Sequence, residues 1–314
     1  MEQANVSENI DKRIGGVGVG TWAWGDKSIW GYGKGYSDAD LREAFTTAVA
    51  SGATFFDTAE LYGFGKSERL LGEFVTGSNA PVAIATKYFP VPWRFGKRSV
   101  LSALRRSLER LNRPSVELYQ VHWPFHILSI RAMMAALAEA RALGLTKAIG
   151  VSNYNTHQMQ KAFDALSPLN VSLRSNQVEF SLLHRAPEKN GLLRLCRELN
   201  VTLIAYSPLA MGMLTGKYSA GNLPTGFRRL RYGRLDFRQF GILLGLIRDI
   251  GEGHGRKSCG QVALNWILAK GAVPIPGAKN GRQAAENAGA SGWSLTRAEV
   301  DALDEASAGM SNYR

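Results

Sequence analysis

Cysteine is scarce in this chain of 314 residues, which contains only Cys196 and Cys259. Neither belongs to a Cys-x-x-Cys pair or lies close to a group of histidines. The sequence therefore lacks both the cysteines of a disulfide framework and the ligand spacing of a zinc site. We expect two unreactive thiols, a reducing compartment and no bound metal ion.

Long apolar stretches are also missing. No run approaches the ~18 apolar residues that a membrane-spanning helix needs, and residues 1–13 contain no apolar region of the kind found in secretory signals. We therefore expect no membrane partner and a cytoplasmic protein, the alternative being a mature plastid enzyme without its transit peptide. Hydrophobic residues still make up 45% of the chain, which is enough for a packed core and excludes disorder as the main state.

Acidic side chains are few relative to basic ones. The chain has 26 Asp and Glu against 38 Lys and Arg, which gives a formal net charge of +12. Such a charge attracts either nucleic acid or phosphorylated small molecules. The arginines are densest in residues 105–113 and 228–234, but no helix-turn-helix, RNA-recognition or zinc-finger motif accompanies them. We therefore expect no nucleic-acid partner and favour a small-molecule ligand.

What the sequence does contain is a repeated strand-and-helix unit. Four segments of similar pattern begin at Ser51, Leu143, Leu199 and Lys270. In each, Gly or Asn ends a helical pattern, as in a left-handed helix cap, and a short apolar stretch with polar residues at its end follows. These Gly and Asn residues are 92, 56 and 71 positions apart. The intervals correspond to three, two and two repeats of about 30 residues, the size of a strand–helix unit.

The remaining copies of the unit can be placed between these segments. Further apolar runs of strand length occupy residues 16–22, 82–87, 116–122 and 175–180. Amphipathic helical patterns alternate with the strands, over residues 40–51, 67–76, 99–111, 130–143, 156–166, 187–199 and 261–270. Apolar strands that alternate with helices indicate a parallel sheet covered by helices. Eight such units predict an α/β fold, a (β/α)8 TIM barrel, as a single domain over residues 1–314.

A doubly wound sheet is the structural alternative. It would show a GxGxxG turn that leads from the first strand into a helix, whereas the glycines here lead into Thr21 and Trp22. Residues 214–238, rich in Gly, Arg and Tyr, are too long for an ordinary connection and predict a loop insertion over the barrel mouth. Residues 291–314 are predicted as a C-terminal helix and tail.

Polar residues stand at the ends of three successive predicted strands. These residues are Asp57, Lys87 and His122, and Tyr62 follows Asp57 by five positions. Each has an ordinary structural explanation by itself, but the C-terminal ends of barrel strands face one active site. An ammonium beside a phenol lowers its pKa and favours proton donation, a carboxylate holds the ammonium, and a neutral imidazole orients a substrate oxygen. The group is suited to protonating a carbonyl oxygen, while a cofactor must supply the hydride.

Eight motifs occur in order along the chain: GVGVGTW, FFDTAELYG, IATKY, VELYQVHWP, AIGVSNY, NQVEFS, IAYSPLAMGMLTGKY and IPGAKNGRQAAENAGA. From residue 16 to about 290 the sequence resembles the aldo-keto reductases, and is more similar to their bacterial, plant and channel-subunit branches than to mammalian aldose reductases. The resemblance implies a (β/α)8 barrel with NADPH extended across its mouth. It also implies that Tyr62 is the general acid, that Lys87 lowers its pKa, that Asp57 pairs with Lys87, and that His122 positions the carbonyl.

The resemblance also implies a set of cofactor contacts. They are Thr21, Trp22, Ser152, Asn153, Gln177, Tyr206, Ser207, Leu209, Gly212, Lys217, Gly277, Lys279, Gln283, Glu286 and Asn287. Physical reasoning supports the last part of this set, because the loop after the eighth strand of a barrel and the following helix often bind phosphate. Lys279 and Arg282 lie there, and two cations suit the 2′-phosphate of NADP better than the diol of NAD. The alternative is that both are solvated loop charges.

Tryptophans near the predicted mouth suggest the substrate. Trp24, Trp93 and Trp123 are the candidate pocket residues, since aromatic walls accept flat or apolar carbonyl compounds; core packing is the alternative. Arg94, next to Trp93, suits an anionic aromatic aldehyde.

We expect an enzyme that reduces aldehydes or ketones to alcohols with NADPH. The alternative is a non-catalytic NADP(H)-binding subunit that senses redox state. Whether the chain is a monomer or a homo-oligomer is left open.

Overall fold

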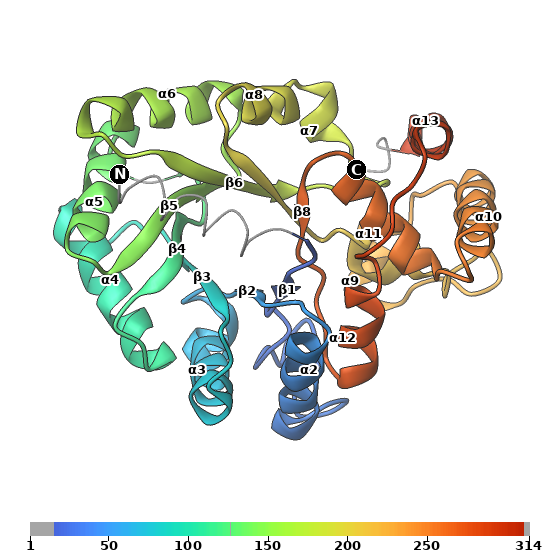
Figure 1. The fold of residues 1–314 in the computed structure, drawn as a ribbon, viewed down its shortest axis with the longest axis horizontal. Helices are drawn as coiled ribbons and strands as arrows, with labels where there is room; N and C mark the ends of the chain where they lie inside the picture. The colour runs from blue at the N-terminus through green and yellow to red at the C-terminus, as the bar shows by residue number, and fades with distance from the viewer. Residues whose placement is uncertain (1–15, 126, 311–314) are drawn as a thin grey trace.

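The computed structural model describes residues 16–125 and 127–310, and within this part the chain forms one eight-stranded parallel sheet in chain order (Figure 1). The strands are β1 (Val19–Gly20), β2 (Phe55–Asp57), β3 (Ala83–Tyr88), β4 (Val116–Val121), β5 (Thr146–Ser152), β6 (Leu173–Glu179), β7 (Thr202–Tyr206) and β8 (Val273–Pro274). The two ends of the sheet meet, because the N–H groups of Gly18 and Gly20 donate to the carbonyls of Pro274 (2.9 Å) and Pro276 (3.0 Å). The predicted eight parallel strands are confirmed. Residues 1–13 and the last four of the predicted tail lie outside the described residues.

Helices cover the outside of the barrel (Figure 1). They are α2 (Asp38–Ala50), α3 (Lys66–Ser78), α4 (Gly96–Leu111), α5 (Ile130–Ala142), α6 (Thr156–Leu166), α7 (Ala186–Lys189), α8 (Leu192–Glu198), α9 (Gly226–Tyr232), α10 (Phe237–Gly253), α11 (Cys259–Ala269), α12 (Gly281–Ala288) and α13 (Arg297–Ser307). The helical patterns agree with these bounds with small shifts at the ends. One prediction differs: the helix expected over 187–199 is divided into α7 and α8, because Gly191 between them has φ +79°.

The segment expected to be a loop over residues 214–238 contains helix α9 and leads into α10. Neither helix is among those predicted from the sequence. Asp236 caps α10, since its carboxylate accepts from the N–H groups of Arg238 and Gln239. Phe240, Leu243 and further apolar residues at helical spacing are buried along one face of α10. A buried apolar face of this kind makes the segment helical.

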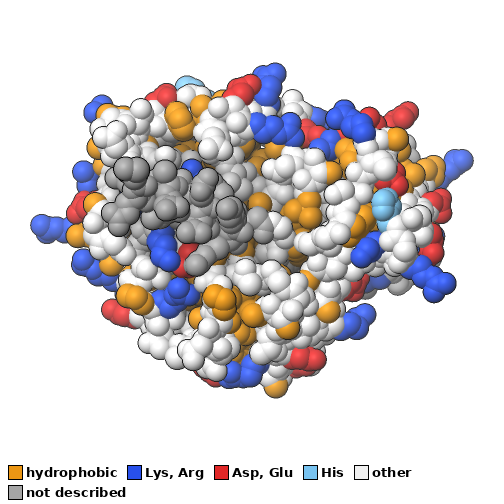
Figure 2. Space-filling view, in the orientation of Figure 1, with side chains coloured by type: hydrophobic (Ala, Val, Ile, Leu, Met, Phe, Trp, Pro, Cys, Tyr) orange, Lys and Arg blue, Asp and Glu red, His pale blue; other side chains and the backbone are white. Residues whose placement is uncertain are grey.

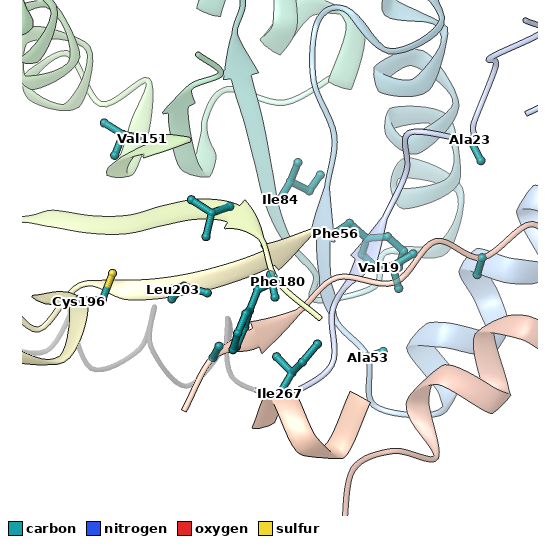
Figure 3. Packing of buried hydrophobic residues seen from close by; sticks show 14 of the residues in the cluster. Val19, Ala23, Ala53, Phe56, Ile84, Val151, Phe180, Cys196, Leu203 and Ile267 are labelled. Atoms are coloured by element: carbon teal, nitrogen blue, oxygen red, sulfur yellow. The ribbon is translucent and has the colours of Figure 1, made fainter. Parts of the chain in front are cut away.

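The core consists of two layers on either side of the strands. One cluster packs inside the barrel and consists of Phe55, Ala83, Ala85, Leu118, Ala148, Ile204, Val273 and Ile275. A larger cluster fills the space between the strands and the helices, where Phe56 of β2, Ile84 of β3 and Ile267 of α11 lie (Figure 3). Neighbouring residues of one strand thus belong to different layers, as expected from the alternation of side chains along a strand.

This alternation places the polar strand-end residues in the barrel. Asp57 follows the interior residue Phe55 by two positions, and Lys87 follows the interior residue Ala85 by two. His122 continues the interior face of β4 one residue beyond the end of that strand. The barrel interior is therefore apolar at one end and polar at the carboxyl ends of the strands.

Charged side chains do not gather into a single patch on the face drawn in Figure 2, where Lys and Arg are scattered around the outline with Asp and Glu among them. Among the described helices, none is long and apolar enough to cross a lipid bilayer.

Barrel closure depends on the close approach of β1 to the segment after β8. A Cβ atom at Gly20 would lie 2.8 Å from the carbonyl oxygen of Ile275, which is backbone and does not yield easily. We expect Gly20→Ala to lower the free energy of unfolding by about 1–3 kcal/mol, as measured by urea denaturation. Gly35→Ala is the matched control, because nothing lies within 4 Å of its added Cβ. Equal stability of the two variants would contradict this account of closure.

Candidate active site

A cavity of about 1730 Å³ lies at the carboxyl ends of the strands. Every residue expected to contact the cofactor lines it: Thr21, Trp22, Ser152, Asn153, Gln177, Tyr206, Ser207, Leu209, Gly212, Lys217, Gly277, Lys279, Gln283, Glu286 and Asn287. Asp57, Tyr62 and His122 line it as well, whereas Lys87 lies behind its wall. The fold thus brings residues from distant parts of the chain to one cavity.

Lys87 is the centre of the polar group at the base of this cavity. Its side chain is fully buried, and its ammonium donates to a carboxylate oxygen of Asp57, to the carbonyl of Thr58 (2.9 Å) and to the hydroxyl of Tyr62 (3.3 Å). These three acceptors match the three N–H groups of the ammonium. The structure therefore places the predicted amine against both its predicted carboxylate and its predicted phenol.

A tight turn brings Tyr62 back over Lys87. Gly63, the next residue, has φ +54°, and a Cβ atom there would lie 2.9 Å from the backbone of Gly25. Glycine supplies this conformation without steric cost and permits the close approach. Asp57 at the end of β2 and Tyr62 in the following turn can therefore both reach Lys87.

Asp57 is held by two amides in addition to Lys87. Its second carboxylate oxygen accepts from Nε2 of Gln177 (2.8 Å) and Nε2 of Gln120 (3.3 Å). Sequence reasoning assigned Gln177 only to the cofactor and missed Gln120. The available signal was its position in β4, two residues before His122 and hence on the same interior face. Both amides fix the carboxylate that holds the ammonium.

The electrostatics of Tyr62 differ from the expectation. Burial, and then the charge of Asp57, raise the pKa of Tyr62 well above its ordinary value. Burial also lowers the pKa of Lys87, although Asp57 acts in the opposite direction. The pKa of Tyr62 is therefore raised and not lowered as predicted, because burial, and then the charge of Asp57, disfavour the phenolate. Tyr62 is held as a neutral phenol, the form that can donate a proton.

His122 is held as a neutral imidazole. Burial, and then the charge of Lys87, place the pKa of His122 well below its ordinary value. Its ring meets the rings of Tyr62 and Phe89 edge-on, with centroids 5.7 Å apart in both cases. Its Nδ1 is buried and has no hydrogen-bond partner among the residues that the structure describes. A neutral ring can donate one hydrogen bond to a substrate oxygen in the cavity.

The ends of β5, β6 and β7 are joined by a network of side chains. The amide nitrogen of Asn153 donates to the carbonyl of His122 (3.1 Å), and its oxygen accepts from the hydroxyl of Tyr206 (3.1 Å). The hydroxyl of Ser152 donates to the carbonyl of Gln177 (2.8 Å). The network fixes the partly exposed ring of Tyr206 at the cavity wall.

Cations gather at the far end of the cavity. The ammonium of Lys279 donates to the carbonyl of Trp30 (2.9 Å) and lies over the rings of Trp30 and Tyr36, 4.9 Å and 4.5 Å from their centroids. Burial, followed by the charges of Arg228 and Lys217, lowers the pKa of Lys279 to about 8. Because these cations repel one another, a bound anion would stabilise the cluster. The phosphates of a dinucleotide are anions that this end of the cavity could bind.

The tryptophan predictions need correction. Trp24 is fully buried among Phe56 and Phe74, and its indole N–H donates to a backbone carbonyl after β8 at 2.9 Å, so it belongs to the core. Trp93 is 73% exposed and does not line the cavity. Trp123 lines it as predicted, and Trp30 lines it as well. The sequence around a tryptophan at the start of a loop does not indicate whether its side chain packs in the core or lies exposed at the surface.

Arg94 is also placed differently from the expectation. Both oxygens of the Glu60 carboxylate accept from its guanidinium, the Nη2–Oε2 distance being 2.9 Å. Arg94 is thus paired with Glu60 and does not line the cavity.

Comparisons with known proteins show the family of the chain. The sequence model of the Aldo/keto reductase family matches residues 16–308. The chain is 41% identical over 303 residues to the chloroplastic pyridoxal reductase of Arabidopsis thaliana, covering 92% of this chain and 82% of that protein.

Two solved structures are similar over most of their length. The thermostable aldo-keto reductase Tm1743, in complex with the inhibitor epalrestat, has a TM-score of 0.74 and 30% identity, covering 92% of this chain and 94% of that one. The aldo/keto reductase of Klebsiella pneumoniae in complex with NADP and acetate has a TM-score of 0.71 and 26% identity, covering 92% and 90%.

Because Lys87 and Asp57 form a buried ion pair, loss of either charge alone should destabilise the protein. Lys87→Met leaves the Asp57 carboxylate buried without its counter-ion, and we expect a loss of about 3–5 kcal/mol in the free energy of unfolding. The double variant Asp57→Asn/Lys87→Met lacks both charges of this buried pair and should recover part of that loss. Urea denaturation of the three proteins measures this. A double variant that is less stable than Lys87→Met would show that the carboxylate is not the source of the cost.

Proposed function

Because the chain belongs to the aldo-keto reductase family, we propose that it reduces aldehydes or ketones to alcohols, with NADPH as the reductant and Tyr62 as the proton donor. One observation carries the proposal: the Lys87 ammonium contacts both the Asp57 carboxylate and the Tyr62 hydroxyl at the base of the cavity. His122 lies against the Tyr62 ring. The phenol and the imidazole therefore face the same small region, where a carbonyl oxygen would sit.

The cavity offers different groups to the two ends of the cofactor. Ser152, Asn153 and Tyr206 suit the nicotinamide, because they combine polar groups with an aromatic surface. Lys217 and Lys279 suit the phosphates at the cationic end. NADPH supplies, when bound, the hydride that no side chain can provide. The complexes of a Klebsiella pneumoniae relative with NADP and NADPH support this choice of cofactor.

The proton step follows from the charges of the chain itself. The high pKa of Tyr62 keeps the phenol protonated until negative charge develops on the substrate oxygen. As the proton leaves, the hydrogen bond from Lys87 to the phenol oxygen strengthens, because the acceptor becomes an anion. Asp57 keeps the ammonium in place throughout. The neutral His122 ring, which carries no competing positive charge, holds the carbonyl oxygen by a hydrogen bond.

We propose flat aromatic aldehydes as the substrate class. Trp22 and Trp123 line the cavity beside the catalytic group, with the ring centroids of Trp22 and Tyr62 6.4 Å apart. Such walls accept a ring by stacking. The Arabidopsis relative is named a pyridoxal reductase, a name that supports an aromatic aldehyde, and its chloroplastic description supports a plastid rather than the cytoplasm.

Removal of the Tyr62 hydroxyl tests the proposed reaction. We expect Tyr62→Phe to lower kcat for the NADPH-dependent reduction of 4-nitrobenzaldehyde by about 10²–10⁴-fold, with little change in NADPH binding. Absorbance at the NADPH band follows the reaction, and fluorescence titration follows binding. Full activity in the variant would rule out Tyr62 as the acid. A wild-type protein that binds NADPH tightly but reduces no aldehyde would favour the alternative of a redox-sensing subunit.

The lowered pKa of Lys279 predicts that NADPH binding depends on pH. A bound phosphate favours the protonated ammonium, so binding should weaken as the pH rises through about 8, where free Lys279 loses its charge. We expect the dissociation constant of NADPH to rise roughly tenfold between about pH 7 and about pH 9, as measured by fluorescence titration. Lys279→Arg keeps its charge and should flatten the dependence. NADH, which lacks the 2′-phosphate, is the control; an equal pH dependence for NADH would contradict a 2′-phosphate contact by Lys279.

A further inference from the structure

Glu60 and Arg94 form an ion pair beside the cavity that the proposed reaction does not use. The guanidinium meets both oxygens of the carboxylate, and the Glu60 side chain is only 8% exposed. The guanidinium also lies over the ring of Tyr88, 5.2 Å from its centroid. Exposed ion pairs contribute little to the stability of a protein. A bidentate and mostly buried ion pair, by contrast, fixes the relative positions of the two segments that carry it.

The pair joins two segments of the site. Glu60 lies in the chain between Asp57 and Tyr62, in the segment that carries the proton donor. Its Oε1 also accepts from the N–H of Phe89 (2.6 Å), and Nη1 of Arg94 donates to the carbonyl of Phe89 (3.0 Å). Both backbone polar groups of Phe89 are therefore held by the pair. The position of Phe89 is tied to the Tyr62 segment.

Phe89 in turn packs on the imidazole. The rings of Phe89 and His122 lie at 84° with centroids 5.7 Å apart, and the Tyr62 ring meets the same imidazole at 81° and an equal separation. Nδ1 of His122 has no hydrogen-bond partner in residues 16–125 and 127–310. Ring packing, with Phe89 and Tyr62 as edge-on neighbours and Trp123 stacked at a centroid distance of 6.5 Å, therefore sets the plane of the imidazole.

We propose that the Glu60–Arg94 pair is a positioning device for carbonyl reduction: it sets the spacing between the Tyr62 hydroxyl and the His122 imidazole. The inference rests on the proposed function. Neither Glu60 nor Arg94 lines the cavity, so both act through Phe89 and the Tyr62 segment rather than on the substrate. Misplacement of reacting groups by about 1 Å can cost about 10²-fold in rate, which is the scale of effect that the pair controls.

Kinetics of Glu60 variants test the proposal. We expect Glu60→Ala to lower kcat for 4-nitrobenzaldehyde by about 10²-fold, while the dissociation constant of NADPH stays unchanged because the cationic end of the cavity is untouched. Glu60→Gln keeps an oxygen that can accept from the Phe89 N–H and should retain more activity than Glu60→Ala. If Glu60 acts through Phe89, the double variant Glu60→Ala/Phe89→Ala should lose no more activity than the more impaired single variant.

The control is Glu73→Ala, which removes the exposed pair of Arg42 and Glu73 and should leave kcat unchanged. Additive losses in the double variant would show that Glu60 does not act on the imidazole through Phe89, and a parallel loss of NADPH binding would show a merely structural role; either result would overturn the proposal. Arg94→Lys tests whether Arg94 binds the substrate directly. An increase in KM for the anionic 4-carboxybenzaldehyde, with no increase for 4-nitrobenzaldehyde, would show that it does and would also overturn the proposal. Aldehyde reduction by the wild-type protein and its loss in Tyr62→Phe test the proposed function independently of these outcomes.

Discussion

Lys87 carries a buried positive charge, and the rest of the site is arranged around the need to compensate it. Asp57 supplies the counter-charge from the neighbouring strand. The carboxylate is in turn fixed by Gln120 of β4 and Gln177 of β6. Such a group requires interior side chains from four strands to converge, which a closed barrel with alternating side chains provides. The ion pair thus connects the fold to the chemistry.

Two neutral groups line the base of the cavity beside the buried ion pair of Lys87 and Asp57, and a cluster of cations lines another part of it. At its base, the phenol of Tyr62 and the imidazole of His122 are both held neutral by burial, with the charge of a neighbour adding to the effect. At its far end, burial, and then the charges of Arg228 and Lys217, lower the pKa of Lys279 to about 8. In the proposed reaction, this arrangement would direct an anionic cofactor toward the cationic end and keep a protonated acid where a carbonyl would be reduced.

Much of the fold and of the site could be predicted from sequence, because both depend on periodic patterns and on strand ends. Asp57, Lys87 and His122 follow directly from the interior face of three strands. Side-chain pairings other than those of Lys87 with Asp57 and Tyr62 could not be predicted. Gln120 is hidden in an apolar strand, and Glu60 and Arg94 find each other only in three dimensions. The pKa of Tyr62 depends on the burial of its ring and then on the charge of Asp57, and Trp24 turns into the core for reasons of packing.

The central claim is that Tyr62, held protonated beside Lys87, gives its proton to the carbonyl oxygen as the hydride arrives. The most direct test is a single-turnover reduction of 4-nitrobenzaldehyde by the NADPH-loaded protein, measured in H₂O and D₂O with protiated and 4-deuterated NADPH. The account predicts that each isotopic substitution slows the same kinetic step and that their combination slows it further. A reduction step that slows with deuterated NADPH but is unaffected by D₂O would contradict proton donation in that step.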